Sequence, residues 1–553
     1  MVTQPTRPDH ANYAHLAVPG VEPDDFRLSG DGLPPAAIAR AHERFLAYLS
    51  EQRTTFMGYQ TDQDLSYSDV LKDYLDFHVN NVGDPFQQGN FTMNSKWLER
   101  AVLDYYAALW NAPWPHDDAD PESYWGYITS MGSTEGNLYA LWNARDYLSG
   151  KALREDFDEH DRSRLIYRSP RPVADSPNAY TPVLFYSRDT HYSIIKDALV
   201  LGIQTFHSVA RQKYGDAHNP LHAGRPWPSE VPSAESGETD VEALVKLVEF
   251  FAAEGYPILV CLNYGTTFKG AYDDVARACE ALAPVFERYG LVSRRVRYEE
   301  TDPYSGRPAG DEDVRAGFWV HVDGALGAAH MPFLELARAA GRVPACGPPF
   351  DFRLPQVSSI AMSGHKWIGA PWPCGIYMTR TKLQLRPPDD PVYIGARDST
   401  FAGSRNGLSA VVLWHYLATH PFDRQIDKAV TLGARAAYAH EQLQRLQRER
   451  PEDLWVERSP LALTVRFRRP SEDIVRKYSL SNERLLVGGE ARAYSHIYVM
   501  EHVTEELIDA LVRDLRRADA FPDQVGGGAP VPRVRAVPGG VAVSVPHEGR
   551  GFR

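Results

Sequence analysis

The chain has 553 residues, 43% hydrophobic and 24% charged, which is ordinary for a globular protein and enough for two or three packed units. A formal net charge of −13 argues against nucleic acid or an anionic membrane as the main partner. The four cysteines form no CxxC pair and no apolar run approaches membrane-spanning length, so neither a zinc cage nor a disulfide framework nor a membrane span is indicated, and a cytoplasmic location is expected.

Residues 1–94 are predicted to form an N-terminal arm and a helical segment. Residues 1–35 are rich in Pro, Asp and Gly, which is typical of an irregular arm. The opening MVTQPTRPDHANYAH has no apolar stretch of the kind that a secretory signal contains. The pattern AAIARAHERFLAYLSEQ, residues 36–52, then predicts a helix.

Residues 95–384 are predicted to form a large α/β domain, because short apolar runs alternate with amphipathic segments. Buried strands of a mostly parallel sheet have this continuous apolar character. The runs are VLFYS (183–187), ILVCL (258–262), FWVHV (318–322) and SIAM (359–362). Helices are expected over 241–255 and 273–290, and loops over 215–238 and 302–317.

Residues 385–520 are predicted to form a small α+β C-terminal domain. A long helix is expected at roughly 424–450, followed by strands in LALTVRFRR (461–469) and SHIYVM (495–500) and by a final helix in TEELIDALVRDLRR (504–517). The remaining segment, 521–553, contains GGGAPVP and VPGGVAV and is expected to be a mobile tail.

Two features near the ends of predicted elements suggest an anion and a planar ligand. In GSTEGN (132–137), small and hydroxyl residues begin a helix, where free N–H groups and the dipole favour an anion, so Ser133 and Thr134 could bind a phosphate. The alternative is a plain helix cap with Glu135 in the first turn. His191 follows the strand VLFYS and could stack on a planar cofactor, or could equally cap a helix or fill the core.

Two further residues follow strands of the same predicted sheet, where ligands of open α/β sheets bind. Asp323 ends the run HVD among small residues, so its carboxylate needs a cationic or hydrogen-bonded partner. A metal or a helix cap would also suit it, but no second carboxylate or His cluster has metal spacing, and no metal site is expected. Lys366, in SGHKWIG, is either a solvated surface charge or a buried nucleophile.

The order of these features is more specific than any one of them. Fold-type I enzymes that use pyridoxal 5′-phosphate (PLP) carry these features in the same order. The order is an anion-binding helix start, a histidine, a strand-end Asp and a Lys 43 residues later. In that chemistry the lysine holds the aldehyde of PLP and the Asp keeps the pyridine nitrogen protonated, so that the ring withdraws electrons from the reacting bond.

The chain resembles the group II PLP-dependent amino-acid decarboxylases, in the branch of histidine and serine decarboxylases, over roughly residues 50–500. The resemblance implies an α/β fold of the fold-type I PLP-dependent transferase kind, with a mostly parallel seven-stranded sheet, helices on both faces and the small α+β C-terminal domain. The matching stretches are NNVGDPF (80–86), YWGYITSMGSTEGNLYAL (124–141), DTHYSIIKDA (189–198), LNYGTTFKGAYDD (262–274), HVDGALGAAHMPF (321–333), SGHKWIGAPWPCG (363–375) and RDSTFAGSRNGLSAVVLW (397–414).

The resemblance also implies residue roles and a homodimer with shared active sites. Lys366 would bond to the cofactor aldehyde, Asp323 would pair with the ring nitrogen, and His191 and Ala325 would pack on the two ring faces. Ser404 would reach the phosphate region of the neighbouring subunit. The other cofactor-binding residues would be Ser133, Thr134, Asn137, Thr266, Ser363 and His365.

The sequence departs from the branch in two places. Relatives usually read GYP in the segment that approaches the substrate, whereas this chain has Tyr59-Gln60 after glycine, which resembles actinobacterial decarboxylases of valine, leucine or methionine. Relatives also carry, on a mobile loop, a tyrosine that returns a proton to the α-carbon. Counting from Trp414 places Phe422 there, and phenylalanine has no proton to donate.

Three explanations of Phe422 are open. His420 could serve as the acid, or Tyr416 if the register slips; the chain could be an engineered variant; or the reaction could consume O2 and yield an aldehyde, as in some plant relatives. We expect PLP-dependent decarboxylation of an apolar L-amino acid of the methionine, valine or leucine class to the amine and CO2. The alternatives are L-histidine decarboxylation and oxidative deamination.

Overall fold

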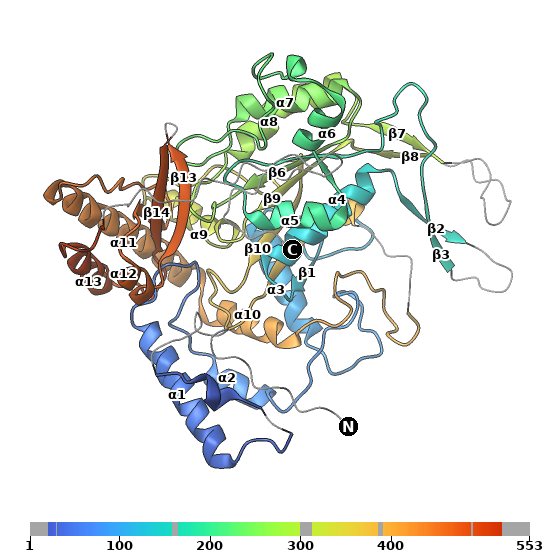
Figure 1. Cartoon of the computed structure of the whole chain (residues 1–553). Coiled ribbons are helices and arrows are strands. Elements are labelled where there is room, and N and C mark those ends of the chain that lie inside the picture. Colours follow the sequence, from blue (N-terminus) through green and yellow to red (C-terminus); the bar gives the residue numbers. More distant parts are fainter. Residues whose placement is uncertain are drawn as a thin grey trace.

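The computed structural model describes residues 20–28, 30–156, 164–298, 312–384, 391–487 and 490–522 (Figure 1). Most of the expected N-terminal arm and of the expected tail, together with the first part of the loop expected over 302–317, lie outside the described residues. No helix in the described part of the chain is long and apolar enough to cross a membrane.

A seven-stranded sheet forms the centre of the described chain, as expected. Strand β11 pairs antiparallel with both of its neighbours, and the other pairings are parallel. The strands in spatial order are β1 (Tyr124–Thr129), β11 (Gly375–Arg380), β10 (Val357–Ser363), β9 (Phe318–Asp323), β6 (Ile258–Asn263), β4 (Val183–Phe185) and β5 (Gln204–Thr205). The four strands expected from their apolar runs are all present.

Helices cover both faces of this sheet, because alternate residues of each strand point to opposite sides. Leu259 and Cys261 pack with α4 (Ser133–Leu148) and α5 (Tyr192–Leu201), which Figure 1 shows lying over the sheet. Val260 and Leu262 belong to the larger core on the other face. That core includes side chains of α3 (Lys96–Leu109), α6 (Phe206–Lys213), α7 (Val241–Ala253), α8 (Val275–Arg288) and α9 (Gly327–Ala339).

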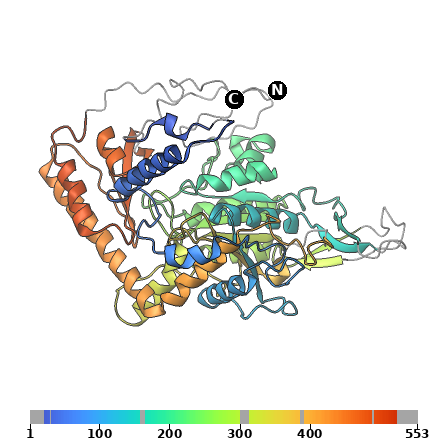
Figure 2. The same cartoon turned by 90° about the horizontal axis from the view of Figure 1, so that it is seen from below.

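The C-terminal part contains the expected mixture of helices and strands. Helix α10 (Gly407–Thr419) leads into the long α11 (Phe422–Glu449). A three-stranded antiparallel sheet follows, in the order β12 (Thr464–Arg468), β14 (Glu490–Tyr498) and β13 (Ser481–Val487). The remaining helices are α12 (Glu472–Lys477) and α13 (Glu505–Leu515). Figures 1 and 2 show α13 beside α11, on the same side of the molecule as β13 and β14.

The remaining elements lie outside these two sheets. The predicted N-terminal helix is α1 (Pro35–Arg53), and the short α2 (Ser68–Leu71) follows it. Strand β2 (Ala152–Asp156) pairs with β3 (Arg164–Arg168), and β7 (Arg294–Arg297) pairs with β8 (Glu312–Arg315). Strand β8 lies in the segment expected to be a loop, because backbone pairing with β7 makes a strand of residues whose own pattern is polar.

Candidate active site

A cavity of about 240 Å³ lies beyond the carboxyl ends of the parallel strands, with residues that follow β1, β4, β6, β9 and β10 in its wall. The carboxyl ends of parallel strands meet at one edge of a sheet, so loops far apart in sequence converge there. The lining includes ten of the residues predicted to bind a cofactor: Ser133, Thr134, Asn137, His191, Thr266, Asp323, Ala325, Ser363, His365 and Lys366.

Lys366 follows β10 and lies in this cavity rather than on the open surface. Burial lowers the pKa of its ammonium group to about 8, and the charge of Asp323 opposes this shift. A larger fraction of the amine is therefore uncharged near neutral pH than for an exposed lysine, and only the uncharged amine attacks a carbonyl carbon.

Asp323 is held by three hydrogen bonds at the end of β9. The Ser133 hydroxyl (3.1 Å) and the Ala325 N–H (3.2 Å) donate to its Oδ1 atom. The Asn137 amide donates to its Oδ2 atom at 2.9 Å. A carboxylate oxygen accepts about two hydrogen bonds, so these contacts leave an acceptor position on Oδ2. Ser133, which was expected beside a phosphate, contacts Asp323 instead in this structure.

The start of α4 forms the opposite wall of the cavity. Gly132 adopts a φ of 71°, and a Cβ atom there would lie 2.6 Å from the His365 ring, so the turn requires glycine. The Ser133 N–H donates to the Ser363 hydroxyl at 3.0 Å. The Thr134 hydroxyl and the helix start remain beside the cavity as donors for an anion.

His365 can also donate to an anion in one of its tautomers. Its Nδ1 lies 3.4 Å from the Cys374 N–H and 3.1 Å from the Cys374 carbonyl. When Nδ1 accepts from the N–H, the ring proton is on Nε2 and is available to a ligand. Burial and the neighbouring Lys366 lower the pKa of His365 to about 4, and a bound dianion would oppose that shift.

His191 adopts the capping role that the sequence offered, and its stacking on a cofactor stays a prediction. It is the N-cap of α5, where its Nδ1 atom accepts the Ser193 N–H at 3.3 Å and lies 2.9 Å from the Ser193 hydroxyl. It also lines the cavity, so capping fixes the ring while leaving it exposed to a ligand.

The chemistry of this wall fits PLP. An aldehyde needs an amine of lowered pKa, a protonated pyridine nitrogen needs an anionic acceptor, and a phosphate needs N–H and hydroxyl donors. Lys366, the open position on Asp323, and the Thr134 end of α4 supply these groups on one cavity.

The predicted substrate residues Tyr59 and Gln60 lie beside this cavity rather than in its wall. His496 connects their segment to the cavity loop, because its two ring nitrogens lie 3.0 Å from the Gly58 carbonyl and 3.2 Å from the Phe268 carbonyl. Gln60 is only 6% exposed, and its side chain contacts the buried Tyr498 hydroxyl. Tyr59 is half exposed.

Ser404 is not in the cavity of its own chain. It is exposed, and its hydroxyl accepts a hydrogen bond from Asn80 at 3.1 Å. An exposed position is what a residue needs if it is to reach a neighbouring subunit, and that role stays a prediction.

Phe422 is also absent from the cavity wall, and the mobile loop expected around it is a two-residue connection between α10 and α11. Phe422 is the first residue of α11, and its ring packs edge-on against Tyr105 and Phe333, each at 5.7 Å. His420 stacks on the buried Tyr416 at 3.9 Å, and neither lines the cavity. The sequence count from Trp414 could not detect that a helix begins at this position.

Several cavity residues were not predicted: Met131, Ser193, Asn263, Gly265, Thr267 and Pro373. Ser193 lies two residues after His191, and Thr267 follows Thr266 directly. Nearness in the sequence to a predicted residue could therefore have identified both. Tyr393 is a further candidate, because it is 82% exposed and lies outside any helix or strand. The signal was a tyrosine in the turn-forming stretch DDPVYIG.

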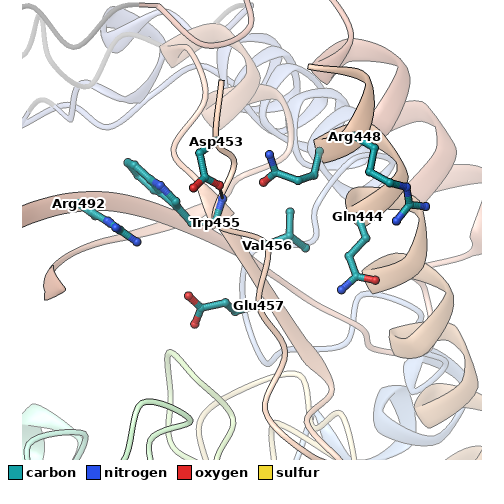
Figure 3. A pocket seen from close by; sticks show the side chains of 8 residues that line it. Gln444, Arg448, Asp453, Trp455, Val456, Glu457 and Arg492 are labelled. Atoms are coloured by element: carbon teal, nitrogen blue, oxygen red, sulfur yellow. Dashed lines mark hydrogen bonds between the residues drawn. The ribbon is translucent and has the colours of Figure 1, made fainter. Parts of the chain in front are cut away.

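A second, more open groove of about 440 Å³ lies in the C-terminal part of the chain (Figure 3). Figure 3 shows Trp455 between Arg492 and Asp453, with Arg448 and Gln444 on the facing helix. None of the predicted site residues lines this groove, and its lining contains no lysine. The predicted cofactor-binding residues therefore gather at the sheet edge and not in this groove.

Three comparisons bear on this site. Residues 55–448 match the pyridoxal-dependent decarboxylase conserved domain. A histidine decarboxylase from Vibrio campbellii is 30% identical over 479 residues, which cover 86% of this chain and 94% of that protein. Serine decarboxylase 2 from Oryza sativa subsp. japonica is 27% identical over 492 residues, which cover 88% and 80%. The crystal structure of an L-methionine decarboxylase from Streptomyces sp. 590, in complex with L-methionine methyl ester, is 48% identical with a TM-score of 0.82 and covers 90% of this chain and 98% of that one.

Proposed function

This chain belongs to the pyridoxal-dependent decarboxylase family and is a PLP-dependent carboxy-lyase, and we propose that its substrate is an apolar L-amino acid of the methionine, valine or leucine class. The products are the amine and CO2. The observation that carries the proposal is that Lys366, with its lowered pKa, and the three-fold hydrogen-bonded Asp323 line one cavity.

When bound, PLP supplies an aldehyde that condenses with amines and a ring that withdraws electrons from the bond to be broken. We assign Lys366 to bind the aldehyde and Asp323 to hold the proton on the ring nitrogen through its open Oδ2 position. His191 and Ala325, which both line the cavity, would hold the ring. The phosphate would be held by Thr134, Ser363, His365, Thr266 and Ser133, and Asn137 supports Asp323.

The substrate class is supported by two observations. The methionine decarboxylase structure is 48% identical to this chain, against 30% for the histidine decarboxylase. Tyr59 and Gln60 are proposed to contact the substrate side chain, and their segment is tied to the cavity loop through His496. In the methionine decarboxylase, a crystal structure of a variant with one glutamine replaced by alanine contains L-methionine methyl ester.

The proton that returns to the α-carbon is assigned to Tyr393. The resemblance implies a loop tyrosine for this step. Tyr393 is a phenol 82% exposed on a loop, whereas Phe422 is 44% exposed at a helix start and has no proton to donate. Tyr393 is absent from its own chain's cavity wall, so it reaches a cavity by loop movement or across a subunit interface. With this assignment, decarboxylation to the amine stays the proposed reaction and oxidative deamination its alternative.

The enzyme is proposed to act as a homodimer in the cytoplasm. Helix α1 exposes Phe45, Leu46 and Leu49, and Trp97 on α3 is also largely exposed. Exposed apolar side chains of this size favour coverage by another protein surface. All four cysteines are free, as is usual in a reducing compartment. Light scattering at micromolar concentration should give the mass of two chains.

The deciding experiment is a panel of the twenty amino acids assayed for CO2, amine, and aldehyde plus peroxide. Methionine, leucine or valine should give amine and CO2 in equal amounts. Lys366→Ala should abolish turnover and the change in visible absorbance on PLP addition, with folding checked by circular dichroism. Turnover of histidine alone would establish the histidine alternative, aldehyde with peroxide the oxidative one, and no CO2 from any amino acid would refute the proposal.

A further inference from the structure

A chain of buried hydrogen bonds runs behind Asp323, on the side away from the cavity. The Trp319 indole N–H donates to the Ser359 hydroxyl at 3.0 Å. That hydroxyl lies 2.9 Å from His321 Nδ1, and His321 Nε2 lies 2.9 Å from Asn137 Oδ1. The Asn137 amide then donates to Asp323. All five side chains are buried, and of the five only Asn137 and Asp323 line the cavity.

The Trp319 end of these hydrogen bonds permits one consistent set of directions. An indole N–H only donates, so Ser359 accepts from Trp319 and can donate its own proton to His321 Nδ1. In that arrangement His321 carries its proton on Nε2 and donates to Asn137 Oδ1. This orientation points the Asn137 N–H at Asp323.

The opposite end requires the same arrangement. An ionised carboxylate only accepts, so Asn137 must present its N–H to Asp323 and its carbonyl to His321. Burial lowers the pKa of His321 to about 4, so the ring stays neutral and has one proton to place. A ring protonated on Nδ1 instead would present a lone pair to the Asn137 carbonyl.

We propose that Trp319, Ser359 and His321 are positioning residues that hold the Asn137 amide with its N–H toward Asp323. This inference rests on the proposed function, in which Asp323 receives the ring N–H of PLP. We call this series of hydrogen bonds from Trp319 to Asn137 the relay. It places the Asn137 N–H on one acceptor position of Asp323 Oδ2 and leaves the other acceptor position of Oδ2 to the cofactor. Its benefit to binding is therefore specific to a ligand that has a ring nitrogen.

The test compares PLP with 1-deaza-PLP, in which a C–H group replaces the ring nitrogen. Dissociation constants are measured by tryptophan fluorescence on apoenzyme freed of cofactor. His321→Phe should weaken PLP by about tenfold, the usual loss for one hydrogen bond to a charged group. Binding of the deaza compound should change by less than about twofold, because it makes no contact that depends on the relay.

Two further variants make the result decisive. Ser359→Ala removes one hydroxyl and should show the same selective loss, so it replaces His321→Phe if that variant does not fold. His330→Phe removes another buried histidine, which contacts Tyr272 and the Leu326 carbonyl but none of the relay residues. It should change the affinities for PLP and for 1-deaza-PLP equally. Equal losses for the two cofactors in His321→Phe and Ser359→Ala, or no loss, would overturn the inference. Failure of the unmodified protein to bind PLP would instead refute the proposed function.

Discussion

Lys269 Nζ lies 3.0 Å from Asp189 Oδ1, and both side chains are about nine-tenths buried. Asp189 stands two residues before His191, and Lys269 stands three residues after Thr266, so this ion pair joins two loops that line the cavity. A buried charge is costly without its partner, so the pair stabilises the mutual position of the loops only while both charges are present.

Removal of one partner should therefore be worse than removal of both. We expect Lys269→Met to lower the free energy of unfolding by about 3 kcal/mol, and the double variant with Asp189→Asn to recover part of that loss. Urea denaturation measures both. As a control, Arg277→Met breaks the exposed pair with Glu242, separated by 3.6 Å, and should cost less than about 1 kcal/mol. A double variant whose loss equals the sum of the single losses would contradict this coupling.

Asp197 should make the protein less stable as the pH rises. Burial raises the pKa of its carboxyl to about 7, Lys196 opposes the shift, and Asp323 adds to it. Because the folded-state pKa lies above the unfolded value, the stability that this group contributes is complete below about pH 4 and is lost as the pH rises through 7. Asp197→Asn should therefore gain stability over the unmodified protein progressively from pH 5 to 8. Thermal unfolding at four pH values tests this, and a constant offset would argue against it.

Arg405 should not be replaceable by lysine. Its guanidinium pairs with Glu99 in a fully buried contact and donates to the Ile128 carbonyl at 3.2 Å and the Gly83 carbonyl at 3.1 Å. A lysine ammonium cannot span these acceptors, so Arg405→Lys should cost about 2–4 kcal/mol of unfolding free energy.

The matched control for that substitution is Arg476→Lys. Arg476 pairs with Glu472 at 3.4 Å, and both side chains are more than half exposed. Its replacement should change the unfolding free energy by less than about 0.5 kcal/mol. Equal effects of the two substitutions, measured by urea denaturation, would mean that the fork geometry of Arg405 is unimportant.

Tyr393→Phe should lower kcat by about 10²–10⁴-fold with little change in PLP affinity, because it removes a proton donor and no cofactor contact. Aldehyde and peroxide should rise as amine falls. Phe422→Leu should change kcat by less than about threefold, because its ring packs against Tyr105 and Phe333 away from the cavity. The reverse ranking, measured with the preferred substrate, would return the role to the neighbourhood of Phe422.

Local patterns in the sequence were sufficient to locate the strands and the residues that follow them. Apolar runs identify β4, β6, β9 and β10 because strands buried on both faces must be apolar throughout. Asp323, His191 and Lys366 then stand where such strands end, and the carboxyl ends of parallel strands share one edge. The order of these residues indicates a fold-type I PLP enzyme, and the family is indicated by the resemblance of the longer stretches around them.

The contacts between these residues were decided by the tertiary structure alone. Ser133 and Asp323 are 190 residues apart, and no local pattern indicates that the serine donates to the carboxylate rather than to a phosphate. The packing of Phe422 against Tyr105 and Phe333 was unpredictable for the same reason, because both partners are distant in the sequence. Sequence determines which side chains can perform the chemistry, whereas packing of distant segments determines which of them meet and which hydrogen bonds they exchange.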